Sequence, residues 1–152
     1  MLIRTIIFLI INFAALGIGG LFTGKGVSSQ WYQNLNKAPW TPPGWSFGAA
    51  WTFIMIALAF YMAYAWENIP KRNLLIVLFA IQWVLNVSWN PLFFKYHEVM
   101  LALIVIVALT VLVALILFLF FGDVKYWSFL LLPYLIWLII ATSLNAYILF
   151  KN

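Results

Sequence analysis

Charged residues are the scarcest feature of this sequence. Its 152 residues include only eight Lys or Arg and three Asp or Glu, so that 7% of the chain is charged. A soluble domain is nearer a quarter charged, whereas this chain is 67% hydrophobic with a mean hydropathy of +1.08. Polar groups are too few to cover the surface of a water-soluble fold. The sequence therefore predicts a single domain, residues 1–152, whose surrounding solvent is lipid.

Cysteine is absent, which excludes disulfides, thiolate metal sites and Cys-linked haem. The one histidine, His97, is expected to be a solvated loop residue rather than a haem ligand, and no metal site is expected. Neither a Ser-His-Asp or Cys-His set nor a paired carboxylate or glycine-rich phosphate loop occurs, so hydrolytic and phosphoryl-transfer chemistry has no candidates. The basic residues are scattered singly or in pairs among the loops. This scatter favours anchors at the membrane interface over a nucleic-acid site.

Five stretches of the chain contain no charged residue. They cover residues 5–24, 38–66, 73–94, 99–122 and 126–150, and each is 20 residues or longer. A bilayer core requires about 20 helical residues to cross, and a charge at mid-membrane costs roughly 3 kcal/mol. The pattern predicts an all-α membrane protein, a bundle of five transmembrane helices at about residues 2–22, 45–66, 73–94, 99–121 and 126–150. The runs are continuous rather than alternating, which argues against a β-barrel.

Short connections follow the second, third and fourth expected helices. They predict an up-down bundle in which consecutive helices are antiparallel neighbours, and Pro133 is expected inside the fifth helix. The direction of insertion cannot be read, because Lys and Arg are balanced four to four between the two sides. One side carries Arg4, Lys71, Arg72 and Lys125, and the other carries Lys25, Lys37, Lys95 and Lys151.

The connection between the first two helices, residues 23–44, is unusually long. Its end overlaps KAPWTPPGW, Lys37 to Trp45, which contains three prolines and two tryptophans in nine residues. Loops of about twenty residues are usually functional or disordered, and the prolines favour one fixed backbone shape. Two interpretations remain open. The segment is either a folded lid on one end of the bundle or an amphipathic segment among the headgroups, where Trp and Tyr are common.

Three carboxamides lie on one face of the third helix. In IQWVLNVSWNPLFF, Gln82, Asn86, Trp89 and Asn90 recur at helical spacing. Carboxamides do not face lipid tails, so they must face other helices or a cavity. Interhelical hydrogen bonds account for a single such residue, whereas three of them interleaved with tryptophan favour a lined pocket.

Aromatic and small residues form comparable stripes on two other helices, near the same membrane end. The stripes consist of Phe47, Trp51 and Met55 in the second helix and Tyr134, Trp137, Ala141 and Leu144 in the fifth. Each stripe alone is typical of helix packing. Together they predict a pocket for a flat, largely apolar ligand, in which aromatic faces stack on its rings and amides orient its polar edge.

These motifs resemble those of the translocator protein family (TspO/MBR), the tryptophan-rich sensory proteins once called peripheral benzodiazepine receptors. WYQNLNKAPWTPPGWSFGAAW is similar to the family's first-loop signature, LNVSWNPLFF to its third-helix motif and LLPYLIWLIIATSLN to its fifth-helix motif. The resemblance covers nearly the whole chain, and the motifs follow in the family's order.

The resemblance implies a five-helix bundle, commonly a homodimer, whose long loop caps a ligand pocket. It implies porphyrins such as protoporphyrin IX as ligands, with cholesterol in animal members and synthetic benzodiazepine or isoquinoline drugs. No cofactor is required, since porphyrin is ligand or substrate. Trp51 and Trp137 correspond to tryptophans implicated in light-dependent porphyrin breakdown by bacterial members. With the stripes included, the expected ligand-binding residues are Tyr32, Pro42, Phe47, Trp51, Met55, Asn86, Trp89, Asn90, Tyr134, Trp137, Ala141 and Leu144.

Some positions depart from the family's pattern. Ala38 stands where the family usually has proline, and Met55 stands where an aromatic is usual. The sequence also carries a weak sterol-recognition pattern, Leu144, Tyr147 and Lys151. Pairs of small residues in the first helix are candidate dimer contacts. These pairs are Ala15 with Gly19 and Gly20 with Gly24.

The leading hypothesis is a membrane receptor-like protein that binds porphyrin in a lidded pocket, with light-dependent porphyrin degradation left open. One alternative is a transporter or carrier of tetrapyrrole or sterol. An ion-coupled transporter usually has an ionisable residue within a span, and the expected spans of this chain contain none. Another is a scaffold that only assembles with other membrane proteins. The expected location is a bacterial cell membrane, with the outer membrane or the mitochondrial outer membrane as alternatives.

Overall fold

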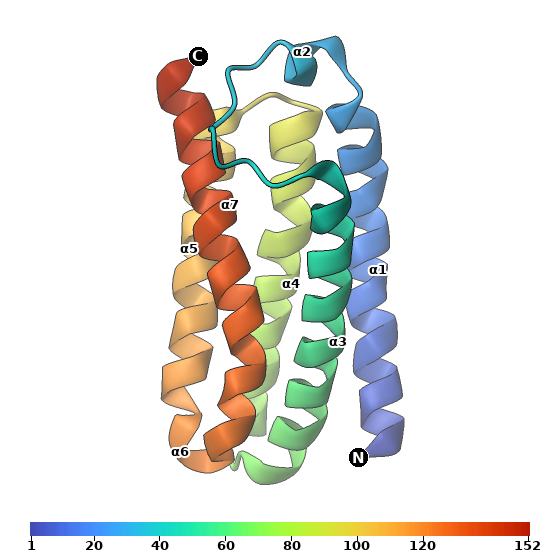
Figure 1. Ribbon diagram of the computed structural model, residues 1–152. Coiled ribbons are helices and arrows are strands. Elements are labelled where there is room, and N and C mark those ends of the chain that lie inside the picture. Colours follow the sequence, from blue (N-terminus) through green and yellow to red (C-terminus); the bar gives the residue numbers. More distant parts are fainter.

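The computed structural model describes residues 1–152, and its regular structure is entirely helical. Five long helices run up and down along one axis (Figure 1). They are α1 (Leu2–Val27), α3 (Gly44–Asn68), α4 (Arg72–Phe94), α5 (Val99–Leu119) and α7 (Leu132–Lys151). The short elements are α2 (Gln30–Gln33), α6 (Phe121–Val124) and the 3₁₀ helix η1 (Lys125–Leu131). Five segments are long and apolar enough to cross a membrane, which confirms the predicted all-α, five-helix membrane fold.

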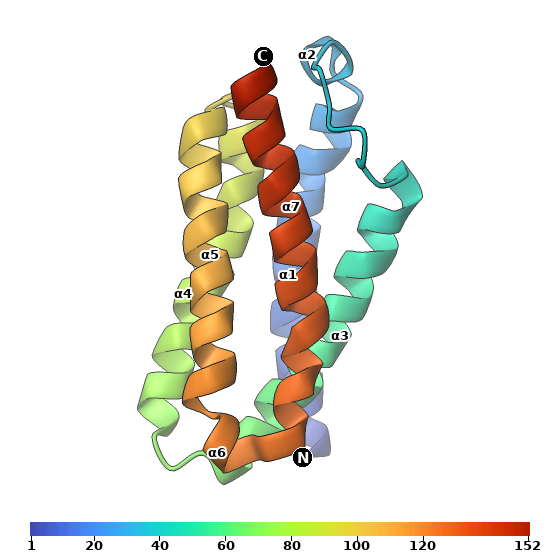
Figure 2. The same cartoon turned by 60° about the vertical axis from the view of Figure 1, so that its left-hand side comes forward.

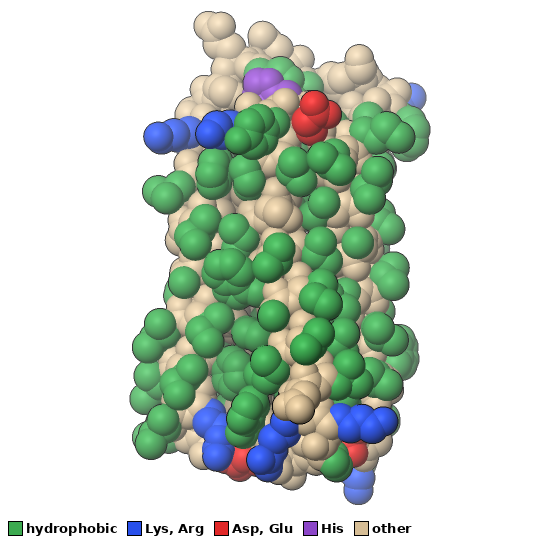
Figure 3. All heavy atoms as spheres, turned by 180° about the vertical axis from the view of Figure 1, so that it is seen from behind, with side chains coloured by type: hydrophobic (Ala, Val, Ile, Leu, Met, Phe, Trp, Pro, Cys, Tyr) green, Lys and Arg blue, Asp and Glu red, His purple; other side chains and the backbone are tan.

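The surface is divided into an apolar band and two charged ends. Seen from behind, hydrophobic side chains cover the long middle of the bundle, while Lys, Arg, Asp, Glu and His side chains gather at its two ends (Figure 3). At the end opposite the long loop, the carboxylate of Glu67 pairs with the N-terminal amine at 2.9 Å and with the guanidinium of Arg4. This distribution is the one that a bilayer requires of a multi-pass membrane protein.

Helix α1 is longer than the sequence predicted. It ends at Val27 rather than near residue 22, so residues 23–27 belong to the helix and not to the long loop. Its last turns contain Gly24 and Gly26, and glycine is a poor helix former. Packing overrides this local preference, because Gly26 lies so close to α4 that a Cβ atom there would come within 2.2 Å of the Phe94 ring.

The fifth span also differs from the prediction. The expected helix at residues 126–150 is divided, because its first residues belong to the 3₁₀ helix η1 and Pro133 lies in the first turn of α7 rather than in mid-helix. A proline in the first turn costs no hydrogen bond, since the N–H groups there have no partner within the helix. The bounds of α3, α4 and α5 agree with the predicted ones to within two residues.

The long helices form a ring in which α1 packs on α3 and α4, α4 on α5, and α5 on α7, while α3 and α7 meet only slightly. The expectation that consecutive helices are packed neighbours is therefore wrong for α3 and α4. They are joined by a short turn, but each packs more extensively on α1. The closed end of the ring is completed by η1, which packs against α3.

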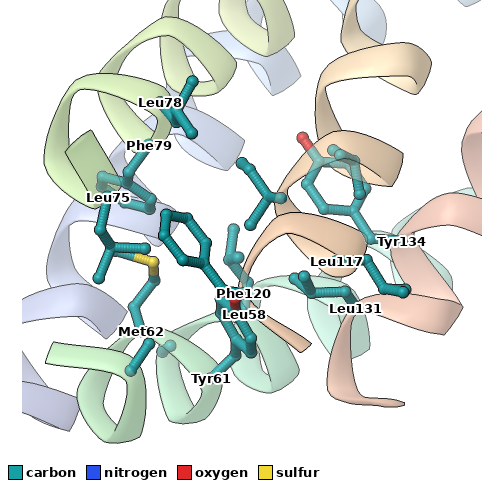
Figure 4. Packing of buried hydrophobic residues seen from close by; sticks show 14 of the residues in the cluster. Leu58, Tyr61, Met62, Leu75, Leu78, Phe79, Leu117, Phe120, Leu131 and Tyr134 are labelled. Atoms are coloured by element: carbon teal, nitrogen blue, oxygen red, sulfur yellow. The ribbon is translucent and has the colours of Figure 1, made fainter. Parts of the chain in front are cut away.

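The hydrophobic core is concentrated in the half of the bundle away from the long loop. Tyr61 and Met62 of α3, Leu75 and Phe79 of α4 and Leu117 of α5 pack together there (Figure 4). Toward the long loop, α3 diverges from α7 (Figure 2). The solid core thus occupies one half of the molecule, and the other half has room for a cavity.

Candidate functional site

A cavity of about 470 Å³ lies in the half of the bundle that the core does not fill. All five long helices contribute to its walls, and residues of the first connection form its roof. Its size is typical of a site for a small organic molecule. Its lining is mostly apolar and aromatic, with a few amides and hydroxyls.

The structure brings most of the sequence-predicted site residues together around this cavity. From the roof come Tyr32 and Pro42, and from the helices come Phe47, Trp51, Asn86, Trp89, Asn90, Trp137, Ala141 and Leu144. They derive from three separate motifs, which the fold brings together around one cavity. Trp51 belongs to α3 and Trp137 to α7, so these two tryptophans, both expected to contact a ligand, lie on different helices.

Met55 and Tyr134 do not line the cavity. Met55 is 2% exposed, and its carbonyl oxygen accepts a hydrogen bond from Asn12 Nδ2 at 3.0 Å. Because an α-helix has 3.6 residues per turn, side chains four residues apart are displaced sideways around the helix at each step. Two such steps separate Phe47 from Met55, so Phe47 faces the cavity whereas Met55 faces α1. Tyr134 is 1% exposed and lies beneath the cavity, with its ring edge-on to Trp51 at 5.8 Å.

A buried hydrogen-bond chain supports the cavity floor. Asn86 Nδ2 donates to the Tyr134 hydroxyl at 2.8 Å, and that hydroxyl donates to Gln82 Oε1 at 2.9 Å. Interhelical hydrogen bonding and pocket lining, the two interpretations of the carboxamide face, each hold for some of these residues. Gln82 serves only interhelical bonding, Asn86 serves bonding and lining, and Asn90 lines the cavity while its Oδ1 accepts from Thr23 Oγ1 at 2.8 Å.

Most polar groups around the cavity are already paired within the protein. Trp89 Nε1 donates to Asn145 Oδ1 at 2.9 Å, and Asn145 Nδ2 donates to the carbonyl of Val99 at 3.0 Å. Among the fully buried polar side-chain atoms of the lining residues, the indole N–H of Trp137 has no hydrogen-bond partner. Its nitrogen is covered by protein atoms, so the ring of Trp137 faces the cavity while its N–H does not.

The long connection forms a folded lid, which we define as residues 28–43. Trp31 stacks on His97 with ring centroids 3.9 Å apart, and Trp40 Nε1 donates to Ser143 Oγ of α7 at 3.0 Å. Asn36 is tied to Asn152 by two hydrogen bonds, of 2.8 and 3.1 Å. The first of the two interpretations, a folded lid, therefore holds for residues 28–43. His97 is exposed as expected, but its ring also anchors the lid.

The lid's chemistry fits a roof over an apolar site. Ala38, at the position where the family usually has proline, is 5% exposed, and its carbonyl accepts from the backbone N–H of Thr41 at 3.0 Å. Burial raises the pKa of Tyr32 above its ordinary value, because the low-dielectric surround disfavours the phenolate. Trp40 remains 55% exposed and Trp45, at the start of α3, 77% exposed, at the level where the lid meets the membrane interface.

The cavity has a mouth between α1 and α3. Gly20 of α1 and Gly44 and Gly48 of α3 line the cavity and are also exposed. A Cβ at any of these three positions would meet no atom within 4 Å. The mouth is therefore edged by bare backbone, and it lies within two candidate membrane spans.

Two other sequence patterns are divided by the fold. In the sterol-recognition pattern, Leu144 lines the cavity, Tyr147 packs edge-on against Trp40 of the lid, and Lys151 is exposed. Among the candidate dimer contacts, Ala15 and Gly19 face the bundle interior, where Gly19 abuts Asn90. That pair therefore cannot form an outward dimer face.

Sequence reasoning missed several residues that line the cavity. They include Thr23, Lys37, Thr41, Ile106, Leu109 and Asn145. Lys37 and Thr41 lie in a loop, where no helical period indicates which side chains point inward. Ile106 and Leu109 belong to a uniformly apolar helix, in which inward and outward faces have the same composition.

Comparison with known proteins gives the same family as the sequence motifs, over nearly the whole chain. The model of the TspO/MBR family matches residues 6–151. Tryptophan-rich protein TspO of Chlorobaculum tepidum is 38% identical over 138 residues, which are 88% of this chain and 86% of the relative. Tryptophan-rich protein TspO of Archaeoglobus fulgidus is 36% identical over 140 residues, 91% of this chain and 90% of the relative. The human translocator protein is 28% identical over 134 residues, 83% and 79% of the two chains. The chain therefore belongs to the TspO/MBR family.

Proposed function

We propose that this protein is a membrane receptor that binds porphyrins, with protoporphyrin IX as the representative ligand, in the cavity under the lid. Membership of a family that includes translocator and tryptophan-rich sensory proteins supports a receptor or sensory role in a membrane. The observation that carries the finer proposal is the lidded, aromatic-lined cavity of about 470 Å³.

The walls suit a flat, conjugated molecule. Phe47, Trp51 and Trp137 supply aromatic surface from two helices, and Ala141 leaves a notch between larger neighbours. Aromatic faces bind a ring system through offset and edge-on contacts. A few amides and hydroxyls among the lining residues give such a ligand polar partners within a mostly apolar surround.

Binding can be measured by quenching of tryptophan fluorescence with protoporphyrin IX in the dark. We expect saturable quenching by the wild-type protein. Ala141→Phe fills the notch and should weaken binding at least about tenfold, which corresponds to ~1.4 kcal/mol. Ala49→Phe is the matched control, because Ala49 is exposed and does not line the cavity. Quenching that does not saturate, or that Ala141→Phe leaves unchanged, would refute porphyrin binding at this site.

A carrier of tetrapyrrole or sterol is the second candidate, and the glycine-edged mouth toward the membrane is the observation that favours it. A receptor retains its ligand, whereas a carrier passes it on. Proteoliposomes separate the two: saturable ligand flux that Ala141→Phe abolishes would replace the receptor proposal with a carrier. Binding without such flux would favour the receptor.

A further inference from the structure

The turn between α4 and α5 holds the one histidine of the chain, His97, in a fixed position. Its φ is 56°, in the left-handed region that few residues other than glycine adopt. On one side of it, the N–H of Tyr96 donates to the carbonyl oxygen of Pro91 at 3.0 Å. On the other side, the N–H of Glu98 donates to the carbonyl oxygen of Leu92 at 2.9 Å. The backbone therefore fixes where the His97 ring lies, although the residue is exposed to water.

Trp31 of α2 lies between this histidine and a hydrophobic cluster at the end of α4. Its indole is parallel to the His97 ring within 9°, and the two ring centroids are 3.9 Å apart. Rings in van der Waals contact cannot approach much closer, so the two rings overlap almost face to face. The other neighbour of Trp31 is the buried Phe93, whose ring lies edge-on with its centroid 5.5 Å away. Trp31 thus joins the lid to the turn without lining the cavity.

The charge on His97 changes the strength of this stack. Two neutral aromatic rings prefer an offset or edge-on arrangement to a face-to-face one. An imidazolium over the face of an indole is attracted by the ring's electron density, as in other cation–π contacts. The observed geometry therefore favours the protonated ring over the neutral one. Histidine is also the side chain that ordinarily changes its charge between pH 5 and 8.

The surroundings of His97 leave the indole as its principal partner. Both ion pairs of the protein involve Glu67, at the opposite end of the bundle, so the imidazole has no acidic partner. Within the turn, Glu98 favours a positive charge on the ring and Lys95 opposes it. The other ionisable side chains at this end are Tyr96 in the turn, Lys25 in α1, Tyr32 and Lys37 in the lid, and Tyr147 and Lys151 in α7. Lysine and tyrosine ordinarily keep one charge state across the range in which histidine changes.

We propose that His97 and Trp31 form a pH-dependent latch, in which protonation of His97 tightens the lid on the bundle and loss of that proton loosens it. By linkage, a contact that is stronger with His97 protonated makes the closed lid bind the proton more tightly than the open lid does. The added stability of the closed lid is therefore present in acid and is lost as the pH rises. The hydrogen bonds of Trp40 with Ser143 and of Asn36 with Asn152 join uncharged groups and hold the lid at either pH.

Hydrogen exchange of the lid tests the latch, in nanodiscs of phosphatidylcholine and without added porphyrin. The reporters are the backbone amides of Gln33, Asn34 and Leu35, which donate within or at the end of α2 at 3.0–3.2 Å. Comparison of each observed rate with the chemical rate at the same pH gives a protection factor, which removes the direct effect of pH on exchange. We expect protection about two- to fivefold greater at about pH 5.5 than at about pH 8, the factor that an exposed cation–π contact supplies.

Three variants assign the effect to the stack. His97→Asn removes the change of charge, and asparagine tolerates a left-handed φ, so its lid should be equally protected at both pH values. Trp31→Leu keeps apolar contact with Phe93 but lacks the indole face, and it should also lose the pH dependence. Glu98→Gln is the matched control, because it removes the neighbouring carboxylate and should keep the pH dependence of the wild type.

Several outcomes would overturn the latch. Equal protection of the wild-type lid at both pH values, or greater protection at about pH 8, would contradict it without any variant. A pH dependence that persists in His97→Asn would assign the effect to another group, and one that persists in Trp31→Leu would exclude the indole. Loss of the pH dependence in Glu98→Gln would assign it to that carboxylate. Because no porphyrin is added, the result is independent of the proposed function.

Discussion

Gly24 and Gly26 are two residues apart in α1 but have opposite surroundings. A Cβ at Gly26 would come within 2.2 Å of Phe94, while a Cβ at Gly24 would meet no atom within 4 Å. We expect Gly26→Ala to destabilise the protein by about 1–3 kcal/mol through overpacking, and Gly24→Ala to stabilise it by up to about 1 kcal/mol through helix propensity. Thermal unfolding in detergent, followed by circular dichroism, measures both. A Gly26→Ala variant as stable as the wild type would contradict the close approach of α1 to α4.

Trp51 and Trp137 are the residues on which a photochemical role depends. An indole beside an excited porphyrin can donate an electron or trap singlet oxygen, and neither step needs an acid–base pair. Light-dependent degradation of bound porphyrin stays a prediction. If it occurs here, Trp51→Phe combined with Trp137→Phe should abolish the loss of porphyrin absorbance under illumination, while saturable binding in the dark persists.

The control for this pair replaces two tryptophans outside the cavity, Trp45 and Trp66, with phenylalanine. Trp45 is 77% exposed, and the ring of Trp66 faces Arg72 at the closed end of the bundle. Illumination of this control should degrade porphyrin at the wild-type rate. Unchanged degradation in the Trp51 and Trp137 double variant would remove these residues from the mechanism.

At the scale of elements, the lid depends on contacts with the end of α7. The side chain of Asn152 donates to and accepts from the backbone of Asn36. Asn152→Ala removes both hydrogen bonds, each worth about 1 kcal/mol, and should raise amide hydrogen exchange in residues 34–43 by about tenfold or more. Exchange in the helices should stay unchanged. Mass spectrometry of the exchanged protein measures the difference.

Asn68→Ala is the matched control for the lid variant. Its amide donates only to Tyr64 of its own helix, at 2.8 Å, at the end of α3 far from the lid. It should leave lid exchange at the wild-type rate. If Asn152→Ala also leaves lid exchange unchanged, the lid is held by its aromatic contacts, such as the Trp31–His97 stack.

At the scale of the whole molecule, the fold could be predicted because the bilayer imposes a strong one-dimensional constraint. Exclusion of charge from five stretches located the spans, and the motif spacing placed Trp51 and Trp137 at one pocket. The ring order could not be predicted, since the α1 contacts with α3 and α4 are set by side-chain shape rather than by composition. Met55 was misplaced because a four-residue stripe drifts around a helix. Lys37 was missed because a loop side chain has no periodicity to reveal its direction.

The glycine-edged mouth has a consequence for the route by which the proposed ligand would reach the cavity. An apolar molecule that reaches the mouth between Gly20 and Gly48 is dissolved in lipid, since both residues lie within candidate membrane spans. Occupancy of the cavity then follows the number of ligand molecules per lipid rather than per litre of water. At a fixed amount of ligand, added lipid dilutes it and empties the cavity, so the protein would report the loading of its own membrane.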